Sequence, residues 1–356
     1  MKKNLKYQDF FKGSIDRIIK LQRQDGSITW FSNGVFDSWN HLESVMALNI
    51  FQYKKETSLG FNYLKDSQLS DGSWYGQLGS AVNIDANDGV FKGDETKAGK
   101  PIRDTNFSAY IATACWHDYL ISQSTEFLEE MWPTIEKAIT FVLNHQSVNG
   151  EIRWAAKDES APHDDALITG CCSIYKSLIC AINCASILKI KKEDWKKSLS
   201  MLGEAIKNRP HLFDRTWESK ERFSMDWYYP ILSGVISNKE AEDKLKEKWD
   251  TFVVKNIGCK CVSDQPWVTV AETAELAITL MKMGKEPDAK KMLSWADKWR
   301  DSNGAYWMGR QYEQDVFWPK EKPPWTSAAV ILAYDSIFKI SKASELFLQD
   351  GLRDSF

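Results

Sequence analysis

Acidic side chains stand beside tryptophan or tyrosine where helix-like segments begin, as in Asp226-Trp227-Tyr228. Carboxyl groups can give and take protons, and aromatic faces can hold a sugar or stabilise a positive charge. The candidate catalytic acids at these helix starts are Asp104, Asp164, Asp165, Asp226 and Glu272. The candidate substrate-binding residues are Trp39, Asn106, Trp227, Tyr228, Asp264, Trp267 and Trp325.

Helix capping is the competing explanation for each of these acids taken alone. Asp and Asn side chains accept hydrogen bonds from the free N–H groups at a helix start, and the helix dipole favours negative charge there. Capping does not explain why an aromatic residue accompanies the acid at most of these helix starts. We therefore interpret the set as a ligand site lined by carboxylates and aromatic rings.

The elements that position these side chains are helices. Apolar residues recur with a period near 3.6, whereas extended alternation is nearly absent. The expected helices span 8–22, 39–53, 57–68, 105–121, 126–145, 165–188, 191–208, 225–236, 238–254, 269–284, 286–300 and 324–340. Every second helix is richer in small and apolar residues, which is typical of the inner layer of a double ring. The sequence predicts an all-α (α/α)6 toroid, a single domain over residues 1–356, whose parallel inner helices all begin on one rim.

Two long segments, 75–104 and 301–323, lack a helical pattern. Loops of this length in a compact domain are usually functional. We expect both to lie over the central cavity, and the aromatic segment 301–323 is the better candidate for a lid.

Composition limits the classes of partner. With 46 basic and 49 acidic side chains the net charge is -3, which offers no basic field for nucleic acid. No stretch approaches the roughly 18 uninterrupted apolar residues of a membrane-spanning helix, so a cytoplasmic location is expected. The aromatic loop leaves peripheral membrane contact open, and the oligomeric state is also open. The expected partner is a small molecule, either an isoprenoid or a glycan.

The cysteines do not predict a metal site. Cys259 and Cys261 precede Asp264, but none of the five histidines follows them, so a zinc site of that kind lacks its later ligand. The seven cysteines are an odd number on apparently apolar segments, which favours reduced thiols. We expect no metal and no cofactor.

A repeat marks the ends of several expected outer helices. In its clearest copy, Gly60 to Trp74, Gln68 is followed by Gly72 and Trp74. Further copies place a polar side chain four residues before a glycine, at Gln22 and Gly26, Gln146 and Gly150, and Arg300 and Gly304. Fixed offsets that recur along a chain indicate a repeat architecture.

This repeat resembles the QW motif of terpenoid cyclases and protein prenyltransferase β-subunits. The resemblance implies a toroid that acts on an isoprenoid substrate in an aromatic-lined cavity. Class II cyclases carry a D-x-D-D motif, which the stretch Pro162-His163-Asp164-Asp165 matches except for its first residue. The resemblance therefore implies acid-catalysed chemistry in which Asp164 is the proton donor and Asp165 its supporting acid.

Two other functions stay open. The segment from Asp104 to Pro133 looks like a helical pair of glucoamylase-like glycosidases, and a glycoside hydrolase would use the rim carboxylates Asp104, Asp165, Asp226 or Glu272. The second alternative is a ring without catalytic activity that binds a glycan or a peptide. The cyclase hypothesis is the main one, and fold alone does not decide between the three.

Overall fold

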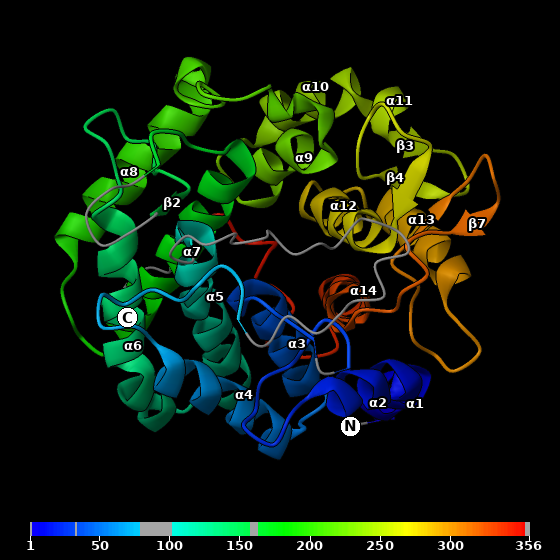
Figure 1. Cartoon of the computed structure of the whole chain (residues 1–356), viewed down its shortest axis with the longest axis horizontal. Helices are drawn as coiled ribbons and strands as arrows, with labels where there is room; N and C mark the ends of the chain where they lie inside the picture. The colour runs from blue at the N-terminus through cyan, green and yellow to red at the C-terminus, as the bar shows by residue number, and fades with distance from the viewer. Residues whose placement is uncertain (1, 33, 79–101, 157–162, 353–356) are drawn as a thin grey trace.

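The computed structural model describes residues 2–32, 34–78, 102–156 and 163–352. Its helices form two concentric rings, as Figure 1 shows. The inner helices are α3 (Ser38–Ile50), α5 (Thr105–Ser122), α7 (Ile168–Ile187), α9 (Ser224–Leu232), α12 (Val270–Lys282) and α14 (Pro324–Phe338). The outer helices are α1 (Lys2–Phe10), α2 (Lys12–Leu21), α4 (Lys54–Ser67), α6 (Thr125–Leu143), α8 (Glu193–Asn208), α10 (Asn238–Glu247), α11 (Trp249–Phe252) and α13 (Glu286–Ala296).

The inner ring is closed. Each inner helix contacts the next one along the chain, and α14 returns to contact α3. By length and composition α7 could cross a membrane, but most of it is buried in the ring. Its apolar composition is explained by its place in the inner layer, where a helix touches protein on both faces. The (α/α)6 toroid predicted from the sequence is thus confirmed.

The repeated glutamines fasten α2, α4 and α6 each to the next outer helix. Nε2 of Gln68, which follows α4, donates to Gly72 O at 2.9 Å and to Thr134 O of α6 at 2.9 Å. Gln22 makes the same two bonds to Gly26 O and to Glu56 O of α4. Gln146 makes them to Gly150 O and to Ser198 O of α8. The repeat therefore builds the outer ring.

The fourth copy closes that ring. Arg300 takes the place of the glutamine, and its guanidinium donates to Gly304 O and to Phe10 O, the last residue of α1. Gly72 shows why the motif needs glycine: its φ is +94°, and a Cβ there would lie 2.2 Å from Lys137 O of the next outer helix.

Short strands join the ring at its edge and were not expected. Strands β3 (Val253–Val254), β4 (Gly258–Lys260), β5 (Trp267–Thr269), β6 (Gly309–Gln311) and β7 (Val316–Phe317) form an antiparallel sheet beside α12 and α13. A second pair joins β1 (Arg103–Asp104) to β2 (Ala155–Ala156). Strands of two or three residues are too short for alternation to reveal. Three 3-10 turns, η1 (Pro210–Leu212), η2 (Lys220–Arg222) and η3 (Asp297–Trp299), complete the described elements.

Of the two segments expected to act as lids, the structure describes only 301–323 in full. Most of 75–104 lies outside the described residues. The segment 301–323 contains β6 and β7, and their hairpin lies at the periphery of the ring in Figure 1. Pairing with β5 holds this hairpin against the sheet, because Trp267 faces Gln311 in the register.

Candidate active site

Six side chains at one level of the inner ring meet at its centre. They are the sixth residues of the six inner helices, counted for example from Ser38 to Glu43 on α3, and all of them line one cavity. We call them the central ring: Glu43, Tyr110, Ser173, Tyr229, Glu275 and Ala329. Because the inner helices are parallel, equal depth along each helix brings these side chains together.

Glu43 is the first carboxyl of the central ring. It is 8% exposed, and Oε1 accepts from Trp39 Nε1 at 3.0 Å and from the Tyr110 hydroxyl at 3.4 Å. Burial raises the pKa of Glu43 well above its usual range, and the charges of Glu275 and Asp37 raise it further. Both hydrogen bonds that the described residues make to this carboxyl go to Oε1, and Oε2 accepts none of them.

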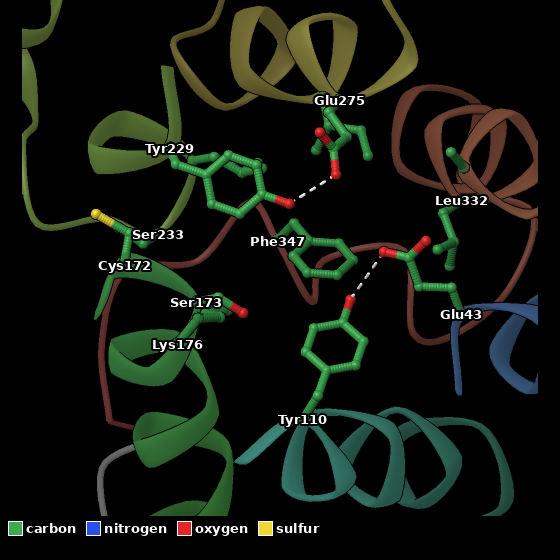
Figure 2. A pocket seen from close by; sticks show the side chains of 13 residues that line it. Glu43, Tyr110, Cys172, Ser173, Lys176, Tyr229, Ser233, Glu275, Leu332 and Phe347 are labelled. Atoms are coloured by element: carbon green, nitrogen blue, oxygen red, sulfur yellow. Dashed lines mark hydrogen bonds between the residues drawn. The ribbon is translucent and has the colours of Figure 1, made fainter. Parts of the chain in front are cut away.

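Glu275 is the second carboxyl of the central ring. Its Oε1 accepts from the Tyr229 hydroxyl at 2.7 Å, and its Oε2 accepts from the Tyr228 hydroxyl. Burial raises the pKa of Glu275 to about 7, the two tyrosine bonds lower it, and the charge of Glu272 raises it. Figure 2 shows Tyr229 reaching toward Glu275 while Tyr110 reaches toward Glu43.

The cavity at the centre has a volume of about 40 Å³. It can hold a few water molecules, since each needs about 10–15 Å³, but it cannot hold a sugar ring. A larger ligand would therefore lie on the rim side of the central ring. The side chains that begin the inner helices there include Trp39, Glu272 and Trp325, which are half-buried and so reach the surface.

Aromatic rings surround this rim side. The ring of Trp39 lies 5.8 Å from Phe107 and 6.3 Å from Tyr229, measured between centroids. Trp325 packs edge-on against Trp30 at 5.7 Å. Of the expected binding residues, Trp39 therefore contacts Glu43 directly, and Trp325 lies one helical turn nearer the rim than Ala329 of the central ring.

Other expected binding residues hold the framework of the site. Tyr228 is fully buried and serves as a donor to Glu275. Trp267 Nε1 donates to Trp318 O at 2.6 Å, which fastens the loop before α14 to β5. Asn106 is buried in the first turn of α5, and among the described residues its Oδ1 has no hydrogen-bond partner.

Asp104 caps a helix in the structure. Its carboxylate accepts from Phe107 N at 2.9 Å at the start of α5, and burial raises its pKa to about 7. Asp37 caps α3 in the same way through Asn40 N at 2.7 Å. Capping, the competing explanation, accounts for the position of both acids.

The Asp-Asp pair taken from the cyclase resemblance is not placed as a proton donor. Asp164 is exposed and pairs with Arg153 at 3.1 Å. Asp165 is buried and accepts from Thr216 N at 2.7 Å, Thr216 Oγ1 at 2.8 Å and Ala166 N at 2.7 Å. Burial raises the pKa of Asp165, but its hydrogen bonds outweigh this effect and lower the pKa below its usual value. A carboxylate so well satisfied accepts hydrogen bonds and does not supply a strong acid.

Three further expected residues face away from the centre. Asp226 accepts from Thr169 N at 3.3 Å and from the Thr169 hydroxyl, so it ties α9 to α7, and burial raises its pKa to about 6. Trp227 is buried, and its Nε1 donates to Lys244 O of α10 at 2.8 Å. Asp264 is an exposed partner of Arg222 at 2.7 Å.

The sequence interpretation, which relied on helix starts, missed the five polar members of the central ring: Glu43, Tyr110, Ser173, Tyr229 and Glu275. These residues lie one turn inside their helices, where capping and loop signals are absent. The available signal was a glutamate inside an otherwise apolar inner helix, because charged side chains are seldom buried without a partner or a function.

The fold and the site define a helical toroid with two carboxyl groups at its centre. No family model matches the chain. It is 36% identical over 330 residues to the MMP endo-(1,4)-3-O-methyl-alpha-D-mannosidase of Mycolicibacterium hassiacum. The aligned region covers 93% of this chain and 86% of that protein. The chain belongs to the family of this mannosidase and is glycosidase-like.

Solved structures share the fold at low sequence identity. A variant of a glycosidase in complex with glucose has a TM-score of 0.70 at 11% identity and covers 94% of this chain and 98% of its own. A D-mannose isomerase has a TM-score of 0.66 at 12% identity, covering 94% and 97%. A sugar epimerase from a ruminal bacterium has a TM-score of 0.65 at 10% identity, covering 95% and 99%.

These findings correct the main hypothesis from the sequence. The assignment to terpenoid cyclases and prenyltransferases, with acid-catalysed chemistry on an isoprenoid, is wrong, because the relative that defines the family is a mannosidase. The repeat Gln68-to-Trp74 misled because it encodes contacts between outer helices, which unrelated chemistries on a toroid can share. The alternative, a carbohydrate-active enzyme, is the one that the family supports.

Proposed function

We propose that the protein is an endo-acting glycoside hydrolase that cleaves α-(1→4)-linked mannoside chains carrying 3-O-methyl groups. The substrate class comes from the mannosidase of the same family. The observation that carries the proposal is the pair Glu43 and Glu275, two carboxyl groups from different inner helices that line one cavity. Most glycoside hydrolases work with two carboxyl groups that flank the scissile bond.

Glu43 acts as the general acid. Burial raises its pKa and so favours the protonated carboxyl, which can give its proton to the departing glycosidic oxygen. The hydrogen bond from Trp39 Nε1 fixes Oε1, which turns the other oxygen to the reaction. The leaving sugar then departs with the proton from Glu43.

Glu275 acts as the general base. Its pKa of about 7 lets it accept a proton from water at neutral pH, and two tyrosine hydroxyls stabilise its charged form. Water attacks the anomeric carbon as the bond to the leaving oxygen breaks. The two carboxyl groups return to their starting states by proton exchange with solvent.

The rim side suits a partly methylated sugar. Half-buried indole rings at Trp39 and Trp325 offer apolar faces to the C–H groups of a sugar ring and to methoxy groups. Glu272, one turn nearer the rim than Glu275, offers a carboxylate to sugar hydroxyls. A neutral glycan needs no basic field, in agreement with the net charge of -3.

The test is hydrolysis of defined oligosaccharides by the purified protein. Oligomers of α-(1→4)-linked 3-O-methylmannose and the same oligomers without methyl groups are incubated separately, and the products are sized by mass spectrometry. Internal cleavage that favours the methylated series is expected. A Glu43→Gln, Glu275→Gln double variant excludes a contaminating enzyme. The proposal fails if wild-type protein leaves both series intact.

A further inference from the structure

The central cavity has, at the level of the central ring, a hydroxyl suited to hold water. Ser173 is 4% exposed, its side chain lines the cavity, and among the described residues its Oγ has no hydrogen-bond partner. A buried hydroxyl without a partner has lost the hydrogen bonds that it makes in water, and a bound water would restore one of them. Figure 2 shows Ser173 on the opposite side of the cavity from Glu43, with Tyr229 and Glu275 above it.

The C-terminal segment forms the floor of this cavity. The ring of Phe347 lies beneath the central ring, and Lys282 Nζ at the end of α12 donates to Phe347 O at 3.1 Å and pairs with Asp350. From α7, Lys176 Nζ donates to Gln349 O at 2.8 Å. Both lysine side chains are buried, so the two bonds hold the floor across the ring.

The cavity volume matches water and not sugar. At about 40 Å³ it admits a few water molecules. A saccharide chain that lies on the rim side would cover the direct path from bulk solvent to Glu275. A water held beneath the central ring would still reach the carboxylate.

We propose that this cavity is the binding site of the water that hydrolysis consumes, and that Ser173 positions this water toward Glu275. The inference rests on the proposed function and adds the source and the path of the nucleophile. The water oxygen forms a bond to the anomeric carbon, and one water proton moves to the Glu275 carboxylate. The bond from the anomeric carbon to the glycosidic oxygen breaks, and that oxygen takes the proton of Glu43.

A stereochemical consequence follows. Water that attacks from beneath the ring, while Glu43 protonates the departing oxygen, displaces it in one step and inverts the anomeric centre. An α-mannoside would therefore release a β-configured reducing end first, which proton NMR can detect before mutarotation.

The experiment compares two isosteric substitutions at one position. Ser173→Val removes the hydroxyl, and Ser173→Thr adds the same volume but keeps it. Ser173→Val should lower kcat by about 10- to 100-fold with KM unchanged, because the water loses its position while the sugar still binds. Ser173→Thr should keep most of the activity, and Ser186→Val, at an exposed position on α7, should keep all of it.

A crystal structure provides a readout that does not depend on activity. Wild-type and Ser173→Thr crystals should show an ordered water within hydrogen-bonding distance of the hydroxyl in the cavity, and Ser173→Val crystals should lack it. Equal kcat for the Val and Thr variants, or a wild-type cavity without ordered water, would overturn the inference while the hydrolase assignment stands. A wild-type protein that cleaves no mannoside overturns the assignment and the role of the water together.

Discussion

The hydroxyl of Tyr229 donates a 2.7 Å hydrogen bond to Oε1 of Glu275, from the sixth residue of α9 to the sixth residue of α12. A donor stabilises the charged carboxylate, whereas burial destabilises it. The balance leaves the pKa of Glu275 at about 7, so this group changes charge near neutral pH. That property suits a base that must be free at neutral pH and must then receive a proton.

Removal of the Tyr229 hydroxyl should shift the pH dependence upward. Tyr229→Phe deletes a donor that lowers the pKa of Glu275, so the pKa rises further and the base is deprotonated only at higher pH. The acid limb of kcat/KM against pH should therefore move to higher pH. Tyr119→Phe, on a half-buried ring of α5, is the matched control and should leave the limb in place.

Neutralisation of Glu272 should shift the same limb in the opposite direction. The charge of Glu272 raises the pKa of Glu275, so Glu272→Gln should lower that pKa and extend activity to more acidic pH. The pH profile of kcat/KM checks the sign. An upward shift, or none, would show that Glu275 is not the group that sets this limb.

The glutamine of the repeat should matter for stability and not for chemistry. Gln68→Ala deletes one hydrogen bond to Thr134 O of α6 and one to Gly72 O in the turn after α4, and should lower the free energy of unfolding by about 1–3 kcal/mol. Gln24→Ala, at an exposed position, should change it little. Urea unfolding measures both. A loss of activity in folded Gln68→Ala would contradict a purely structural role.

His117 should make the protein sensitive to mild acid. It is buried, neither ring nitrogen has a hydrogen-bond partner among the described residues, and burial lowers its pKa from 6.5 to about 3. Because the unfolded chain binds this proton below pH 6.5 and the folded chain does not, the stability contribution is lost as pH falls. The stability gained by His117→Leu should grow by about 1.4 kcal/mol between pH 7.5 and pH 5.5, measured by urea unfolding. An equal difference in unfolding free energy between the variant and the wild type at both pH values would show that His117 also binds the proton in the folded state.

The ring was predictable because its signals are local. Helical periodicity gave the six helical pairs in their order, although two of the expected outer helices are each divided in two, and the spacing of Gln68 to Gly72 marked where an outer helix meets the next one. The sheet from β3 to β7 was not predictable, since its strands are short and pair across distant segments.

The site was only partly predictable because acids at helix starts have two uses. Asp104 and Asp165 have the residue type and position of rim acids, yet their hydrogen bonds show one to be a helix cap and the other a tie to Thr216. Glu43 and Glu275 meet through equal depth on parallel helices, a relationship that exists only once the ring is closed.

The most direct test of the carboxyl pair compares two leaving groups. With the methylated mannoside oligomer, whose leaving oxygen needs a proton, Glu43→Gln and Glu275→Gln should each lower kcat/KM by about 10²–10⁴-fold. With an activated dinitrophenyl mannoside, Glu43→Gln should recover most of that loss, because the phenolate leaves without a proton, whereas Glu275→Gln should not recover. Equal losses on both substrates for both variants, or near wild-type activity of either variant on the oligomer, would contradict the assignment of Glu43 as acid and Glu275 as base.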